Sequence, residues 1–211
     1  MNIRQCVLKR YVSMGMAVAF LITGAVACSN ESGSVEGSCI SVSEDGTILD
    51  CIRESFDKDY YDQQELQTQV LQAVANYNSR VGEERISVEK VQINGDVTDV
   101  KMEFRSYQDY ADFNREIFFI GTPLEAQAAG FDLNKVYVGA EDDSKTMGEA
   151  QLLASTGVKV LITDTDQTIQ LYDKILYVSD HVRVGAKSKS FQIVTDENNQ
   201  ISKEVCVIFK E

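Results

Sequence analysis

The chain contains no tryptophan and, among its 211 residues, only one histidine and one proline. The lone histidine, His181, argues against a zinc hydrolase, because zinc sites of that kind usually need two or three imidazoles. The lack of tryptophan removes the most effective side chain for stacking on a sugar ring. The sequence also has no glycine-rich phosphate loop, CxxC or HExxH motif. We therefore expect no cofactor.

Basic residues are also scarce. The chain has 20 lysines and arginines against 33 aspartates and glutamates, a formal net charge of −13. Phosphate binding needs a basic face, so this balance argues against a nucleic-acid partner. It equally disfavours attraction to anionic lipid, and any attachment to a membrane must have another source.

The N-terminus has the layout of an export signal. The basic residues Arg4, Lys9 and Arg10 precede an apolar run over 14–22, and small residues follow this run up to Cys28. The run is shorter than the roughly 20 apolar residues that cross a membrane as a helix. The layout therefore predicts a signal peptide over residues 1–27.

The end of this segment predicts lipid attachment. Ala25-Val26-Ala27-Cys28 resembles a lipobox, the motif read by lipoprotein signal peptidase, although Ala25 stands where leucine is commonest. An ordinary cleavage site that happens to precede a cysteine is the alternative. The resemblance implies a bacterial lipoprotein, with fatty acyl chains such as palmitate on Cys28. These chains would hold the protein on the extracytoplasmic side of the cell membrane.

The remainder predicts a tether followed by one folded domain. Residues 28–37 are polar and rich in glycine and serine, as in a flexible linker. Residues 38–211 are long enough for a single globular domain, with two subdomains split near 120–135 as the alternative. Loss of the signal leaves 17 basic and 33 acidic residues, a formal charge of −16, so the lipid must supply the membrane affinity.

Cleavage of the signal peptide would remove Cys6, and Cys28 would carry the lipid. Three of the five cysteines then remain. Cys39 and Cys51 flank a predicted hairpin, and a disulfide between them is one interpretation for an oxidising compartment. The alternative is that Cys39, Cys51 and Cys206 are all small buried residues.

The first half of the domain predicts two β-hairpins and a long helix. The hairpins turn at Asp45-Gly46 and Asn94-Gly95, two strong hairpin signals between runs of β character. A change of phase near Glu89-Lys90 suggests a β-bulge. The helix begins at Asp62, which forms a capping box with Glu65, and runs to about residue 80.

Short helices and strands alternate in the rest of the domain. Helices are predicted to begin at Ser106, at Thr122-Pro123 and at Thr146. Strands are predicted over 117–120, 136–138, 158–162, 169–171, 175–178, 191–194 and 205–209. Most of the turns read as hairpin turns. The predicted fold class is therefore α+β, with mainly antiparallel sheets and three to four short-to-medium helices.

One segment resembles a phosphatase motif. An apolar strand followed by Asp164-Thr165-Asp166-Gln167-Thr168 is similar to the first motif of the haloacid dehalogenase-like phosphatases. That resemblance would make Asp164 a nucleophile and Asp166 a general acid beside magnesium. However, Gln167 replaces the usual glycine, and the 43 residues after Thr168 are too few for the later motifs. An acidic turn after a strand explains the segment better.

Two acidic segments are candidates for a calcium site. Asp164 and Asp166 form one, and Asp142 and Asp143 the other. The first does not fit an EF-hand loop, because Ile169 stands where glycine is required. Solvated surface carboxylates are the simpler interpretation of both segments, so no metal site is assigned.

The remaining candidates for catalysis also have simpler interpretations. His181 and Cys206 are formally a base and a nucleophile, but Cys206 lies in the apolar run 205–209 and reads as a core thiol. His181 reads as an exposed turn residue. Carboxylate pairs of the glycosidase kind have no distinguishing context in so acidic a chain. We expect the protein not to be an enzyme.

Two tyrosine pairs are candidate recognition groups. Tyr60-Tyr61 and Tyr107 with Tyr110 are aromatic clusters that suit a ligand or a peptide. Their places at helix starts and at helical spacing favour packing on the core instead.

Two short strings, at 45–48 and 56–62, are similar to uncharacterised small lipoproteins of Gram-positive anaerobes. The resemblance covers the first half of the mature chain and implies no activity. The leading hypothesis is therefore a non-catalytic surface lipoprotein that binds a partner or supports the cell envelope. A receptor for a small ligand or calcium, and a small envelope hydrolase, are the alternatives. The expected partner is a protein or a small ligand.

Overall fold

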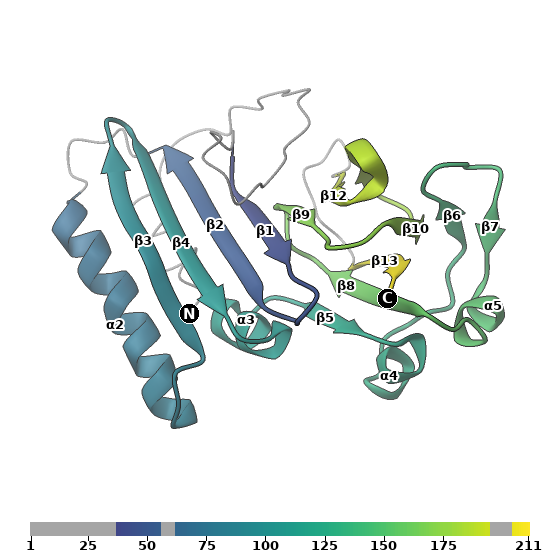
Figure 1. Ribbon diagram of the computed structural model, residues 1–211, viewed down its shortest axis with the longest axis horizontal. Helices are drawn as coiled ribbons and strands as arrows, with labels where there is room; N and C mark the ends of the chain where they lie inside the picture. The colour runs from purple at the N-terminus through teal and green to yellow at the C-terminus, as the bar shows by residue number, and fades with distance from the viewer. Residues whose placement is uncertain (1–36, 56–61, 195–203) are drawn as a thin grey trace. The chain divides into compact units, whose positions relative to one another are not determined.

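The computed structural model describes residues 37–55, 62–194 and 204–211 (Figure 1). The predicted signal peptide 1–27, the lipid site Cys28 and the pair Tyr60-Tyr61 lie outside the described residues. Within the part that is described, no helix is both long enough and apolar enough to cross a membrane.

The chain divides into two compact units. Among the described residues, the first unit combines the stretch up to Ile40 with Asp45–Arg115, and the second combines Ser41–Glu44 with Glu116–Glu211. The main boundary therefore lies at Arg115, whereas the alternative considered for the sequence had a split near 120–135. Each unit contains antiparallel strand pairs and helices, so the α+β class and its antiparallel character are confirmed.

The first unit is built on three long strands and two helices. In chain order its elements are the first two residues of β1 (Cys39–Val42), then β2 (Ile48–Ser55), α2 (Gln63–Val81), β3 (Ile86–Asn94), β4 (Val97–Phe104) and α3 (Tyr107–Asn114). Strand β4 pairs with β2 on one side and with β3 on the other, antiparallel in both cases. The β3–β4 register shifts between Val88 and Lys90, which confirms the predicted bulge.

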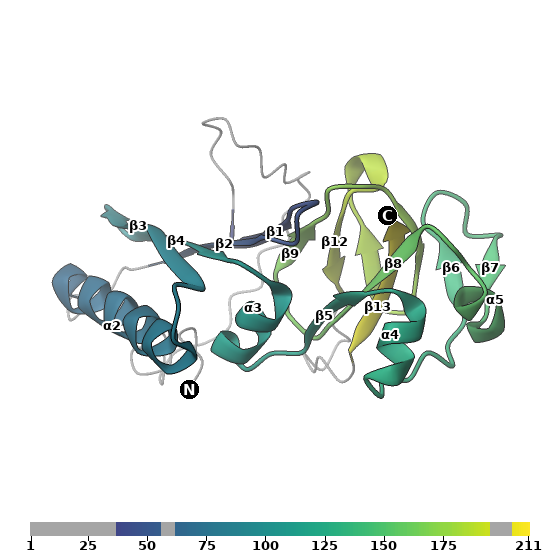
Figure 2. The same ribbon diagram turned by 60° about the horizontal axis from the view of Figure 1, so that its bottom comes forward.

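Helix α2 lies along β3, with which it makes extensive contact (Figure 2). Oδ1 of Asp62 accepts hydrogen bonds from the amides of Gln64 and Glu65 at 2.7 and 3.0 Å, so the predicted N-cap is confirmed. The prediction of a full capping box is wrong, because the Glu65 carboxylate accepts a bond from the side chain of Gln69 and not from the Asp62 amide. The helix ends at Gly82, whose φ of 81° is readily reached only by a residue without a Cβ.

The core of the first unit is aromatic. The ring of Phe104 on β4 packs edge-on against Tyr110 and Phe113 of α3, with centroids 5.2 and 5.6 Å apart. Tyr77 of α2 packs edge-on against Phe113 at 5.6 Å. These rings attach both helices to β4.

The second unit contains a six-stranded sheet in the order β5-β8-β13-β10-β6-β7 and a three-strand run in the order β11-β12-β9. The strands of the six-stranded sheet are β5 (Phe118–Gly121), β6 (Tyr137–Gly139), β7 (Thr146–Met147), β8 (Val158–Thr163), β10 (Ile175–Val178) and β13 (Val205–Lys210). The others are β9 (Thr168–Gln170), β11 (Val182–Val184) and β12 (Ser190–Ile193). Every residue from Val205 to Phe209 is buried, so β13 has covered faces on both sides.

The helices of this unit are short: α4 (Pro123–Ala128), α5 (Glu149–Leu153) and the 3₁₀ turn η2 (Ala186–Ser188). The capping box of Thr122 and Glu125 at the start of α4 is confirmed. The predicted start of α5 at Thr146 is wrong, because Thr146 belongs to β7 and Gly148 is the N-cap. The Gly148 amide donates to the side chain of Gln151 at 3.0 Å.

The interpretation of Cys39 and Cys51 as a disulfide is wrong. Cys51 and Cys206 are free thiols, so neither of them is paired with Cys39. Cys51 lies on the half-exposed face of β2, whereas its neighbours Asp50 and Ile52 point into the core. Side chains on successive strand residues point to opposite faces, so proximity along a hairpin does not place two thiols together.

Candidate functional site

A pocket of about 680 Å³ lies within the second unit. We name it the His181 pocket. It is lined by residues of three segments that are distant in sequence, namely 132–136, 179–181 and 204–205. The segments come from the loop before β6, the turn after β10 and the start of β13.

The first segment is a tight turn. Oδ1 of Asp132 accepts a hydrogen bond from the Asn134 amide at 2.9 Å, and the Lys135 amide donates to the Leu133 carbonyl at 2.8 Å. The hydroxyl of the buried Tyr137 donates to the same Leu133 carbonyl at 3.1 Å. These bonds hold the turn in a shape that leaves the side chain of Val136 64% exposed at the pocket.

The second segment is held through its backbone. The amide of Ser179 donates to the Cys206 carbonyl at 2.9 Å, and its Oγ accepts from the Cys206 amide at 3.0 Å. The His181 carbonyl accepts from the Val194 amide at 2.7 Å. His181 itself has a φ of 64°, in the left-handed region. A residue with a Cβ is disfavoured there by roughly 1–2 kcal/mol.

The charges around the pocket are unequal. Asp132, Asp180 and Glu204 are carboxylates, and Lys135 is the one lysine or arginine in the lining that the structure describes. The Lys135 ammonium donates to the Glu204 backbone carbonyl at 3.2 Å and so joins the first and third segments. None of the three carboxylates forms an ion pair with a lysine or arginine of the described residues.

The two residues considered for nucleophilic catalysis have different environments. His181 is exposed in a turn, as predicted, and lines the pocket. Cys206 is completely buried in β13, and burial raises the pKa of its thiol to about 11. A thiol with that pKa is protonated at neutral pH, so the interpretation of Cys206 as a core residue is confirmed.

Asp164, the nucleophile implied by the phosphatase resemblance, instead connects two strands. Its Oδ1 accepts a hydrogen bond from the Ile117 amide at 2.9 Å, and its amide donates a hydrogen bond to the Ile117 carbonyl at 3.4 Å. These contacts join the end of β8 to the residue before β5. Burial raises the pKa of the Asp164 carboxyl above its usual range, and the charge of Glu204 adds to the increase. Asp166, two residues later, is exposed.

The other calcium candidates lie in an exposed turn. Oδ1 of Asp142 accepts from the Ser144 hydroxyl at 2.6 Å and from its amide at 3.2 Å, which lowers the pKa of the Asp142 carboxyl. Asp143 beside it is exposed. Across the described ranges, no group of three or more His, Cys, Asp or Glu side chains is placed to hold a metal ion. The structure therefore does not assemble Asp142, Asp143, Asp164 and Asp166 into such a group.

The tyrosines of α3 belong largely to the core. Tyr110 is completely buried against Phe104, which confirms the packing interpretation for this residue, and Tyr107 is half-buried.

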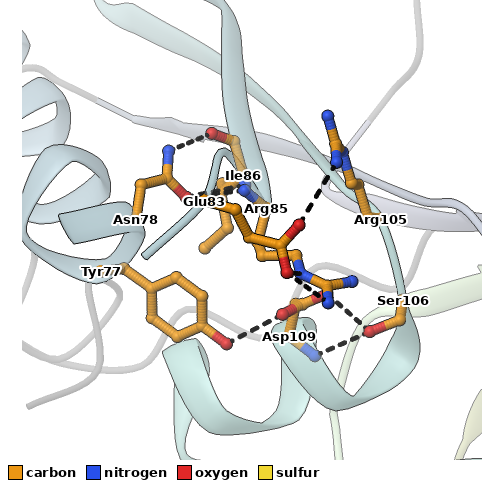
Figure 3. Close-up of polar contacts among 8 residues, drawn as sticks. All are labelled: Tyr77, Asn78, Glu83, Arg85, Ile86, Arg105, Ser106 and Asp109. Carbon is orange, nitrogen blue, oxygen red and sulfur yellow. Dashed lines mark hydrogen bonds and ion pairs between the residues drawn. The ribbon is translucent and has the colours of Figure 1, made fainter. Parts of the chain in front are cut away.

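A second polar cluster lies in the first unit, between α2 and α3 (Figure 3). The Tyr77 hydroxyl donates to Oδ1 of Asp109 at 3.1 Å, and the Ser106 hydroxyl donates to Oδ2 at 2.6 Å. Burial, followed by the bond to Asp109, raises the pKa of Tyr77 to about 12. We name Tyr77, Ser106 and Asp109 the Asp109 network. Because both carboxylate oxygens have donors from the protein itself, the network has a structural role.

The side chain of Asn78 extends this polar region toward β3 (Figure 3). Its amide nitrogen donates to the Ile86 carbonyl at 2.8 Å, and its oxygen accepts from the Arg85 and Ile86 amides at 2.9 and 3.0 Å. On the surface nearby, Glu83 pairs with Arg85 at 2.6 Å and with Arg105 at 3.9 Å. One asparagine thus connects the end of α2 to the start of β3.

No protein-family model, curated protein or solved structure matches the chain. The functional assignment therefore depends on the geometry. Sequence reasoning did not find the His181 pocket, apart from noting His181 as a turn residue. Asp132 and Glu204 carry no motif, and nothing local indicates that they share a cavity with His181.

Proposed function

We propose that the protein is a lipid-anchored surface lipoprotein whose folded part binds a partner through the His181 pocket without performing chemistry. In this proposal, the lipid on Cys28 holds the chain on the extracytoplasmic face of the cell membrane. The α+β units beyond residue 37 then present the pocket to the surroundings.

The observation that carries this proposal is the pocket itself. Its volume of about 680 Å³ falls in the range of roughly 300–1,000 Å³ typical of small-ligand sites. Its lining combines polar groups with the exposed side chain of Val136. Such a combination favours the recognition of a small group over the packing of a core.

The chemistry of the surrounding residues favours binding over catalysis. Cys206 lies in the core with a raised pKa, and Oγ of Ser179 already accepts a hydrogen bond from the Cys206 amide. Asp164 accepts a hydrogen bond from the Ile117 backbone. A nucleophile needs a positioned base and room for a substrate. The contacts of these three residues serve the fold instead.

The anchor is tested by replacing Cys28. The Cys28→Ser variant should lose incorporation of labelled palmitate. The matched control is Cys6→Ser, which changes a cysteine within the signal peptide and should leave labelling and location unchanged. A natural chain that incorporates no palmitate, or a Cys28→Ser variant that is labelled as strongly as the natural chain, would contradict the lipid on Cys28.

Binding is tested through the single histidine. His181 is the only histidine in the sequence, so ¹³C-histidine labelling of the untagged mature protein in detergent micelles gives one imidazole signal that reports on the pocket. A ligand that binds should shift this signal and raise the melting temperature. A broad panel of small molecules and short peptides that moves neither would contradict the proposal. If the protein converted a bound compound and His181→Ala abolished this turnover, the proposal of a binding function would be wrong and an enzymatic function would take its place.

A further inference from the structure

We infer that the His181 pocket recognises an alkylammonium group, the cationic end of a primary amine on a short aliphatic chain. This inference rests on the proposed function, because it specifies the ligand of the same pocket. It follows from the cavity, from the balance of charge in its lining and from the apolar surface beside those charges.

The cavity carries an excess of negative charge. Asp132, Asp180 and Glu204 contribute three carboxylates, and none of them has an ion-pair partner in the described part of the chain. Elsewhere on the described surface, several carboxylates do have such partners, for example Glu141 with Lys174 at 3.1 Å and Asp112 with Arg80 at 2.6 Å. A bound ammonium would supply the missing positive charge through charge-assisted hydrogen bonds.

The pocket already accommodates one ammonium group. The Nζ of Lys135 donates to the backbone carbonyl of Glu204 at 3.2 Å. That contact uses a backbone oxygen and leaves the carboxylate of Glu204 to other partners. Among the described lining residues, an anionic ligand would meet three like charges against one lysine, so this part of the lining selects against it.

The shape of the site favours an organic cation over a metal ion. The three carboxylates come from separate segments, and the described residues hold no group of three acidic, cysteine or histidine side chains suited to a metal. A calcium ion needs six to eight oxygens at roughly 2.3–2.6 Å. A cavity of about 680 Å³ is far larger than a bare ion and has room for an amine with its carbon chain.

Apolar surface lies beside the charges. The side chain of Val136 is 64% exposed, and Val205 also lines the cavity. An aliphatic chain can cover such surface, with a gain of roughly 0.8 kcal/mol per buried methylene. The combination of carboxylates and valines therefore matches an ammonium group on a short carbon chain.

The experiment compares four five-carbon or lysine-like probes by titration against the ¹³C-histidine signal of untagged mature protein in micelles. Pentylamine is the expected binder, and pentanoate and pentanol are matched anionic and neutral controls. Nα-acetyl-lysine methylamide distinguishes a lysine side chain of a peptide from a free amine as the natural source. Pentylamine should shift the signal at concentrations where pentanoate and pentanol do not, and added salt should weaken its binding.

Substitutions in the lining test which carboxylates bind pentylamine. Asp132→Asn and Asp180→Asn should each weaken pentylamine binding by about threefold to tenfold, because each removes one negative charge and keeps the side-chain size. In Asp132→Asn, the oxygen of the introduced side-chain amide can still accept the bond from the Asn134 backbone, so the turn is retained. The control is Glu141→Gln, which lies outside the lining and should leave the affinity unchanged.

The outcomes separate the two proposals. If pentanol or pentanoate shifts the signal as strongly as pentylamine does, the pocket binds ligands but the alkylammonium inference is wrong. If pentylamine and the lysine analogue both fail while another compound of a broad panel binds, the inference is again wrong and the binding function stands. If nothing in the panel binds, both proposals are contradicted.

Discussion

The carboxylates of the Asp109 network and of the His181 pocket have opposite environments. In the first unit, Asp109 is only 7% exposed, and the hydroxyls of Tyr77 and Ser106 donate to its two oxygens. In the second unit, the carboxylates of the His181 pocket line an open cavity without ion-pair partners among the described residues.

This difference separates a structural role from a binding role. A buried carboxylate is tolerated only when the protein satisfies it, and removing one member leaves the other polar groups buried without partners. A carboxylate at an open cavity is solvated, so it contributes little to stability and is available for a ligand. The comparison thus predicts where substitutions lower stability and where they change binding alone.

The largest effect is expected at the centre of the Asp109 network. Asp109→Ala removes the acceptor for the hydroxyls of Tyr77 and Ser106 and should lower the free energy of unfolding by about 2–3 kcal/mol. Urea denaturation measures this change. The control is Asp112→Ala on the same helix, whose pair with Arg80 is exposed and worth at most about 1 kcal/mol. Equal losses in the two variants would contradict the structural role of Asp109.

An intermediate effect is expected at Asp164, a half-buried carboxylate between these two extremes. Asp164→Ala removes the acceptor for the Ile117 amide and should cost about 1–2 kcal/mol. Asp164→Asn keeps an acceptor and removes the charge that burial disfavours. It should therefore be at least as stable as the natural protein at pH 7.

The pH dependence of the Asp164 variants gives a further check. The pKa of Asp164 is raised in the folded state. The contribution of this carboxyl group to stability is therefore present at pH values below its ordinary pKa of 3.8, and it is lost as the pH rises through the folded pKa. The advantage of Asp164→Asn should therefore grow with pH in that window and then level off. Urea denaturation at a series of pH values measures it, and an Asn variant that is less stable at pH 7 would show that the charged form is favoured.

The smallest effect is expected for the backbone of the His181 pocket. His181 has a positive φ, so His181→Gly removes strain at this position while making the unfolded chain more flexible. Its free energy of unfolding should exceed that of His181→Ala by up to about 1 kcal/mol, because both variants lose the imidazole and only the glycine removes the strain. Urea denaturation of the two variants measures this difference. Equal stability of the two variants would contradict strain at this position.

Most secondary structure could be predicted because its signals are local. The N-cap at Asp62, the capping box of Thr122 and Glu125 and the turn at Asn94-Gly95 each involve residues no more than a few positions apart. The bulge near Glu89 was also visible as a change of alternation. The three-residue strand β11 was missed, since so short a run carries little periodic signal.

The candidate site could not be predicted for the opposite reason. Asp132, His181 and Glu204 meet only because strands β6, β10 and β13 are neighbours in one sheet. The incorrect disulfide has a related cause. Cys39 and Cys51 are close along a hairpin, but the direction of a strand side chain depends on which face the core covers.

Local patterns in the chain were sufficient for the antiparallel α+β class, the main turns and most helix starts, and they alone support the prediction of an export signal with a lipid on Cys28. These features depend on side chains that interact within one turn or one short segment. The folded arrangement was needed to establish that Asp164 bonds to a neighbouring strand, that Asp109 is enclosed by hydroxyls and that three distant carboxylates line one cavity with His181. Those roles depend on long-range packing, which determines which polar groups meet a protein partner and which meet water.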